Sequence, residues 1–120
     1  MSRRSFQQGD IVWVRVADQR GFIKRRPAIV LSPTHAITRD GTAMVVAVTT
    51  TLPAVLSDDF VELPWDLTGK SASKLQRRSA AKCDWVREVP VDDCEWAGGQ
   101  VLKDTIRKIL VAIDRYRSRS

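Results

Sequence analysis

The chain has 120 residues, of which 43% are hydrophobic and 28% charged, with 20 Lys+Arg against 14 Asp+Glu and a formal net charge of +6. This length predicts a single domain over residues 1–120, and the hydrophobic fraction excludes wholesale disorder. No apolar run approaches the roughly 20 residues of a membrane helix, and no apolar segment follows the first arginines as in a signal peptide, so we expect a cytoplasmic protein. The excess of positive charge favours a polyanionic partner, most simply a nucleic acid.

Strand patterns occupy the part of the chain before residue 90. Residues 11–16 alternate with a period of two and follow a turn at Gly9-Asp10, which predicts a first strand. The other predicted strands are the apolar runs 28–31, 43–48 and 60–63, and the segment 79–89. Residues 65–77 are small and polar and predict a loop.

The pattern changes to helical spacing near the C-terminus. The recurring apolar and aromatic positions predict an amphipathic helix over 102–117, and they are Leu102, Ile106, Ile109, Leu110, Ile113 and Tyr116. Asp104 in the first turn and Arg115 and Arg117 in the last suit the helix dipole. Strands and helix together predict a mainly β (α+β) fold, in which about five short antiparallel strands form a curved sheet or small barrel covered by the helix.

Basic side chains are concentrated in two segments, residues 15–26 and 70–87. The first contains Arg15, Arg20, Lys24, Arg25 and Arg26, and the second contains Lys70, Lys74, Arg77, Arg78, Lys82 and Arg87. Acidic side chains gather elsewhere, within residues 58–66 and 88–95. A basic surface set apart from acidic ones suits a groove that follows a phosphate backbone, so we expect the two segments to flank one groove.

Several catalytic motifs are excluded. Thr68-Gly-Lys-Ser71 is similar to the end of a phosphate-binding loop, but Pro64 stands where that motif needs its first glycine. His35 is the only histidine, which rules out a mechanism that uses a histidine pair. The spacing of Cys83 and Cys94 matches no standard zinc motif, so we expect two free thiols and neither a metal nor a cofactor.

One ordered set of motifs remains informative. Its members are Gly9-Asp10, Trp13, Arg26-Pro27-Ala28, Ser32, Thr49, the pair Asp84 and Val86, and the terminal helix. In this order they resemble the MazF/PemK family of toxin endoribonucleases from toxin–antitoxin modules. The resemblance is closest over residues 8–50, extends to 60–64, and is loose over 65–82 and 88–98.

The resemblance implies a fold, a reaction and partners. The fold is a small SH3-like or CcdB-like barrel of about five to seven antiparallel strands with a C-terminal α-helix. The reaction is metal-independent, sequence-selective cleavage of single-stranded mRNA, in which the 2′-hydroxyl attacks the adjacent phosphorus and leaves 2′,3′-cyclic phosphate and 5′-hydroxyl ends. The family acts as a homodimer and is neutralised by an acidic cognate antitoxin.

The resemblance also implies which residues act. The family's arginine before proline falls on Arg26 and its catalytic threonine on Thr49, and a guanidinium and a hydroxyl both suit stabilisation of a pentacoordinate phosphorane. Many family members carry an acidic residue in the loop before Arg-Pro, whereas residues 21–25 contain none here, so Asp18 is the nearest candidate acid or base. Trp13 and Trp85 are expected in the core or in a subunit interface. The predicted RNA contacts are Arg20, Phe22, Lys24, Arg25, Lys70, Lys74, Arg77 and Arg78.

Two alternatives without catalysis stay open. The first is a toxin that binds a protein, as the related gyrase poisons do, although the ending Arg115–Ser120 does not resemble theirs. The second is an RNA-binding module on the same fold that has lost catalysis, which the missing loop carboxylate favours. Either alternative predicts that RNA stays intact.

Overall fold

A computed structural model describes residues 5–119, which fold into six strands and one long helix. The strands are β1 (Asp10–Ala17), β2 (Ile23–Val30), β3 (Thr42–Thr49), β4 (Phe60–Glu62), β5 (Ala80–Pro90) and β6 (Glu95–Gln100), and the helix is α1 (Lys103–Arg119). Short 3-10 turns at Thr34–Ala36 and Val91–Asp93 lie between β2 and β3 and between β5 and β6. Over these residues no helix is long and apolar enough to cross a membrane.

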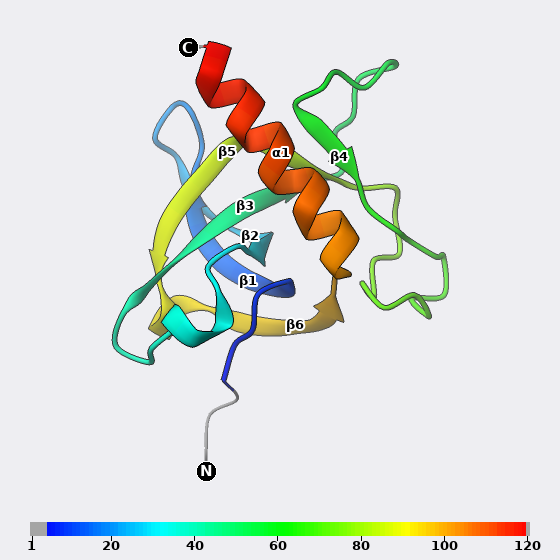
Figure 1. The fold of residues 1–120 in the computed structure, drawn as a ribbon. Coiled ribbons are helices and arrows are strands. Elements are labelled where there is room, and N and C mark those ends of the chain that lie inside the picture. The colour runs from blue at the N-terminus through cyan, green and yellow to red at the C-terminus, as the bar shows by residue number, and fades with distance from the viewer. Residues whose placement is uncertain (1–4, 120) are drawn as a thin grey trace.

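All strand pairings are antiparallel, and the order across the sheet is β4-β5-β3-β2-β1-β6. The sheet is strongly curved, and α1 lies across it against β4 and β5 (Figure 1). The predicted mainly β fold with antiparallel strands and a C-terminal helix is therefore confirmed.

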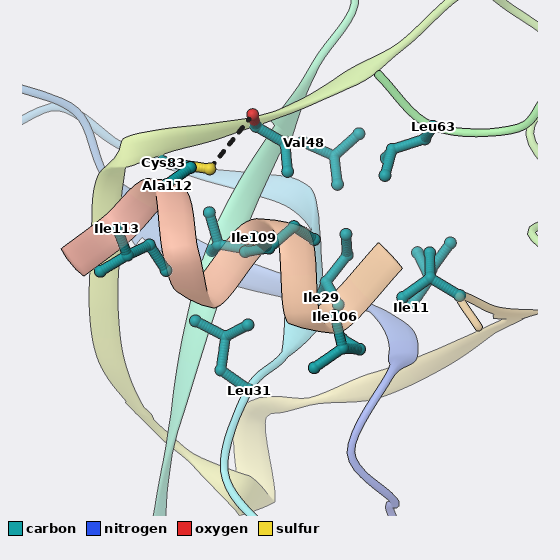
Figure 2. Packing of buried hydrophobic residues seen from close by; sticks show 13 residues of the cluster. Ile11, Ile29, Leu31, Val48, Leu63, Cys83, Ile106, Ile109, Ala112 and Ile113 are labelled. Carbon is teal, nitrogen blue, oxygen red and sulfur yellow. Dashed lines mark hydrogen bonds between the residues drawn. The ribbon is translucent and has the colours of Figure 1, made fainter. Parts of the chain in front are cut away.

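The core occupies both faces of the central strands. Ile106, Ile109 and Ile113 of α1 pack into one buried cluster with Ile11 and Ile29 of the sheet (Figure 2). The second cluster uses the alternate positions of the same strands and contains Val12, Val14, Val16, Ala28, Val30, Val45 and Val89. Because successive side chains of a strand point to opposite faces, this two-sided burial leaves functional side chains to the strand ends and the loops.

β2 is longer than the sequence predicts. The predicted strand starts at Ala28, whereas β2 begins at Ile23 and passes through Arg26 and Pro27. Its first half lacks an apolar pattern, because it is held by continuous pairing with β1 rather than by burial. Pro27 is tolerated because pairing with β3 begins only at Ala28, so this half of β2 is an edge on that side.

The sequence pattern does not predict β6, because Gly98 and Gly99 lie within it and glycine is depleted in strands. The register with β1 slips here: Ile11 pairs with Gly99, but Val12 pairs with Trp96. Gly98 has a φ of +95°, the left-handed conformation that glycine adopts without strain. The irregularity is therefore a glycine-dependent β-bulge that bends the end of the sheet.

Cys83 and Cys94 are free thiols, as predicted. Burial, with a smaller effect of nearby carboxylates, raises the pKa of Cys83 to about 12 and that of Cys94 to about 11. The Cys83 thiol donates to the carbonyl oxygen of Ala81 at 3.8 Å, within the helix-facing cluster (Figure 2). Both thiols therefore stay protonated at neutral pH and are poor nucleophiles.

Candidate active site

A cleft of about 630 Å³ opens beside the point where β2 and β3 part. Both predicted catalytic residues and four of the predicted RNA contacts line it. The lining residues are Ile11, Trp13, Lys24, Arg25, Arg26, Pro27, Val48, Thr49, Thr50, Thr51, Ser73, Lys74, Leu75, Gln76, Arg77, Ser79, Trp85 and Ala97. Segments far apart in the sequence thus meet in one cleft.

The parting of the two strands brings Arg26 and Thr49 to the same opening. In the described structure the β2–β3 ladder ends at the pair Ala28 and Ala47. Arg26 precedes Ala28 by two residues and Thr49 follows Ala47 by two, so the period of two places both side chains on one face of the sheet. Beyond the ladder β3 pairs with β5 through Thr49 and Ala80, which leaves space between β2 and β3.

Arg26 is half-buried and stacks on an aromatic ring. Its Cζ lies 4.9 Å from the ring centroid of Trp85. Its Nε is buried and has no hydrogen-bond partner among the described residues. An unpartnered buried donor costs about 1–3 kcal/mol, and a guanidinium is permanently charged. An anionic acceptor in the cleft would therefore satisfy both the donor and the charge.

Thr49 is held with its hydroxyl hydrogen free to donate. Its Oγ1 accepts the backbone N–H of Thr51 at 3.1 Å, which uses one lone pair and fixes the side-chain rotamer. Thr50 and Thr51 also line the cleft, but both are exposed and follow the end of β3. Thr49 is the only member of this threonine run that belongs to the strand.

The charged side chains that line the cleft are all cations. Lys24, Arg25 and Arg26 come from β2, and Lys74 and Arg77 come from the loop before β5. Residues from each of the two predicted basic segments, 24–26 and 74–77, therefore line one cleft. Neither a carboxylate nor an imidazole is among the described lining residues. Nor does any group of three or more His, Cys, Asp or Glu that could hold a metal ion occur within residues 5–119.

The loop that carries Lys74 and Arg77 is held against β6 by close backbone contacts. The N–H of Gln100 donates to the carbonyl oxygen of Ala72 at 2.9 Å. A Cβ on Gly99 would lie 1.9 Å from the carbonyl oxygen of Ser73, so only glycine permits this approach. Gly99 thus determines how closely the loop before β5, which forms one wall of the cleft, approaches β6.

Asp18, the predicted acid or base, lies outside the cleft. Its Oδ1 accepts the backbone N–H groups of Arg20 at 2.9 Å and Phe22 at 3.0 Å, which shapes the turn between β1 and β2. Asp18 and Arg20 line a separate hollow of about 230 Å³ that shares only Trp85 with the cleft. The position of the carboxylate therefore gives no support to an acid–base role.

Three further predicted RNA contacts also do not line the cleft. Phe22 is 67% exposed at the tip of the β1–β2 turn. The Arg78 guanidinium forms an ion pair with Glu62, and the backbone N–H of Lys70 donates to Asp66. Contact of these residues with RNA stays a prediction.

Sequence reasoning missed the aromatic lining of the cleft. Trp13 is 42% exposed and lines the cleft, so it does not lie in the core of this chain, and its alternative place in a subunit interface stays a prediction. The sequence does contain a signal for this exposure. Val12 and Val14 on either side of Trp13 face inward, so the alternation along the strand turns Trp13 outward. Trp85 is half-buried, and its contact with Arg26 follows from the curvature of the sheet, which no local pattern reveals.

Several solved structures share this fold. A chain of the MazE–MazF crystal structure from Deinococcus radiodurans superposes with a TM-score of 0.71 at 21% identity, covering 98% of this chain and 100% of that one. The Mycobacterium tuberculosis toxin MazF-mt6 gives 0.69 at 19% identity, covering 91% and 96%. An endoribonuclease in complex with its cognate antitoxin, from Mycobacterial species, gives 0.67 at 18% identity, covering 95% and 96%. These likenesses establish a MazF-like fold.

The sequence also identifies the family. Residues 7–116 match the family described as PemK-like, MazF-like toxin of type II toxin–antitoxin system. Because the match spans nearly the whole chain, this protein belongs to that toxin family, which confirms the predicted resemblance. A search of the curated proteins finds no match.

Proposed function

We propose that this toxin is a sequence-selective, metal-independent endoribonuclease that cleaves single-stranded mRNA in the cytoplasm. In this proposal the 2′-hydroxyl attacks the adjacent phosphorus, and the products carry 2′,3′-cyclic phosphate and 5′-hydroxyl ends. One observation carries the proposal: Arg26 and Thr49 line a single cleft whose charged side chains are all cationic. Such a cleft suits a polyanion with its scissile phosphate between the two residues.

Arg26 is proposed to stabilise the phosphorane. As the 2′-oxygen attacks, negative charge grows on the two non-bridging phosphoryl oxygens. A planar guanidinium can donate two parallel hydrogen bonds to these oxygens. The unpartnered Nε–H supports this role, because the donor is already desolvated before the substrate arrives.

Thr49 is proposed to donate a further hydrogen bond to the same phosphoryl group. Its oxygen already accepts from the Thr51 N–H, and its own hydrogen stays available for another acceptor. Removal of one preorganised donor to a transition-state oxyanion costs about 100- to 1,000-fold in rate in other enzymes. We expect a loss toward the lower end for Thr49→Val, because Arg26 remains.

Proton transfer in this proposal relies on solvent rather than on a carboxylate. No carboxylate or imidazole is among the described residues that line the cleft. The 2′-hydroxyl proton therefore passes to water or hydroxide, and the P–O bond to the 5′-oxygen breaks as that oxygen takes a proton from water. Electrostatic stabilisation of the phosphorane supplies most of the acceleration. The cleavage rate is then expected to rise with pH without the break that a carboxylate base would impose.

We also propose that the toxin is a homodimer and that an acidic antitoxin occupies the same cleft. The cleft combines basic side chains with apolar ones such as Trp13, Pro27 and Leu75, which suits an acidic segment that also carries apolar anchors. Fold neighbours are described as a MazE–MazF structure and as an endoribonuclease with its cognate antitoxin, which supports such a partner.

The test is incubation of the pure protein with a long RNA in EDTA, beside the variants Arg26→Ala and Thr49→Val. We expect cleavage that survives EDTA, ends that carry 5′-hydroxyl groups, and loss of cleavage with Arg26→Ala. Circular dichroism and thermal melting of the variants control for folding. Intact RNA at high protein excess would refute the nuclease proposal.

The absence of a carboxylate from the lining favours one alternative, a non-catalytic module that binds RNA in the same cleft. This alternative predicts that the protein binds RNA without cleaving it. A toxin that binds a protein, as the gyrase poisons do, is expected neither to bind nor to cleave RNA. Measuring RNA affinity and RNA integrity in the same samples separates all three cases.

A further inference from the structure

Two neighbouring arginines of β2 are held in different ways. Arg25 forms an ion pair with Glu95 of β6, which offsets its charge and occupies part of its guanidinium. Arg26, the next residue, has the ring of Trp85 at 4.9 Å, and its buried Nε has no acceptor among the described residues. The two arginines thus differ in their neighbours, a carboxylate for Arg25 and a ring face for Arg26.

The Trp85 ring is itself fixed from two sides. Its Nε1–H donates to the carbonyl oxygen of Ala17, at the end of β1, at 2.8 Å. Its apolar part packs against the cluster that contains Val14 and Val16. An indole tied to β1 and to the core offers a face whose orientation does not depend on the cleft being occupied.

A ring face and a carboxylate differ in how far they use the N–H donors and the charge of a neighbouring guanidinium. A carboxylate would accept the guanidinium N–H groups and cancel their charge. A ring face attracts the cation through its quadrupole and fixes the plane of the guanidinium, and it accepts none of the in-plane N–H groups. We propose that Trp85 is a positioning residue for Arg26, which holds the guanidinium plane so that its N–H edge faces the scissile phosphate. The inference rests on the proposed nuclease function.

The kinetic test compares two substitutions that differ in the ring. Trp85→Met keeps apolar bulk without an aromatic face, and Trp85→Phe keeps a face but loses the hydrogen bond to Ala17. Under single-turnover conditions we expect Trp85→Met to lower the cleavage rate at saturating enzyme by about 10-fold. The half-saturating concentration should change by less than about threefold, because Arg26 is one of several cations that bind the backbone. Trp85→Phe should stay within about threefold of the wild-type rate.

The matched control is Trp65→Met, because Trp65 is also a partly exposed tryptophan at 41% but does not line the cleft. It should leave both kinetic constants unchanged. A Trp85→Met protein as fast as wild type would overturn the proposal. Equal losses in Trp85→Met and Trp85→Phe would also overturn it, because the ring face would then be irrelevant.

A measurement on Arg26 itself separates failure of this inference from failure of the proposed function. In the wild type, the NMR signal of the Arg26 Nε–H should show a ring-current shift and should move when uncleavable 2′-O-methyl RNA is added. In Trp85→Met the ring-current shift should be lost and the response to RNA should shrink. A wild-type protein that leaves RNA intact would refute the nuclease, whereas an Arg26 signal unaffected by Trp85→Met would refute the positioning role.

Discussion

Replacing Gly99 by alanine tests whether the loop before β5 forms one wall of the cleft. An alanine Cβ at this position would lie 1.9 Å from the carbonyl oxygen of Ser73 and 2.4 Å from its carbon, whereas real Cβ contacts essentially never fall below 3.0 Å. The loop must therefore retreat by about 1 Å. Overpacking of this kind costs about 1–3 kcal/mol, and the strained hydrogen bond from Gln100 to Ala72 adds about 1 kcal/mol. We expect the free energy of unfolding to fall by about 2–4 kcal/mol.

The same retreat should weaken RNA binding, because the loop carries Lys74 and Arg77 into the cleft. We expect a loss of about 1 kcal/mol of binding free energy, which is roughly fivefold in affinity. Urea denaturation measures the stability, and fluorescence anisotropy with a 2′-O-methyl RNA measures the affinity without cleavage.

Gly98→Ala is the matched control. A Cβ on Gly98 meets nothing within 4 Å, but its φ of +95° strains any other residue. This variant should lose about 1–2 kcal/mol of stability through backbone strain and keep its RNA affinity. The reasoning is refuted if Gly99→Ala is as stable as the wild type, or if the two variants weaken RNA binding equally.

Three smaller predictions concern charge and titration. Arg77→Ala should reduce the slope of log affinity against log salt by about 0.7. Arg107→Ala, whose guanidinium pairs with Asp104 on α1 and does not line the cleft, should leave the slope unchanged, and equal slopes would contradict the assignment of the cleft. A hydrogen bond from the Arg15 side chain holds the pKa of the Asp93 carboxyl below its ordinary 3.8. The contribution of this carboxylate to folding stability is therefore complete above pH 3.8 and is lost as the pH falls through the lower pKa of the folded state. Asp93→Asn should therefore reduce the fall of the melting temperature at acid pH. An unchanged fall would refute this role of Asp93. Burial, with a smaller effect of Asp93, raises the pKa of Cys94 from 9.0 to about 11, so alkylation at about pH 8 should be roughly 100-fold slower in the folded protein than in urea.

The elements that bury an apolar stripe could be predicted from the sequence, and those held by pairing could not. β1 and α1 show their period because an apolar stripe of each faces a core cluster, and β3 is a continuous apolar run because both of its faces are buried. The first half of β2 is polar and depends on β1, and β6 contains the bulge at Gly98. Their stabilisation comes from neighbouring strands, which a local pattern does not contain.

The site was predictable in its parts but not in its assembly. Arg26 and Thr49 came from the family resemblance, and the basic segments came from local composition. No sequence pattern shows that the β2–β3 ladder ends just before Arg26 and Thr49, so that both residues line one cleft. The support of Arg26 by Trp85 depends on the curved sheet bringing β5 to the end of β1, and the aromatic lining was therefore missed.

The most direct test of the proposed reaction removes a single oxygen atom from the substrate. Once the cut site in an RNA is mapped, the nucleotide on its 5′ side is replaced by its 2′-deoxy counterpart in an otherwise unchanged oligonucleotide. Attack by the 2′-hydroxyl predicts that cleavage at this bond stops, while the substituted strand still competes for the cleft and the Arg26→Ala protein cuts neither strand. Cleavage of the substituted strand at the same bond, with a 5′-phosphate on the product, would contradict the account.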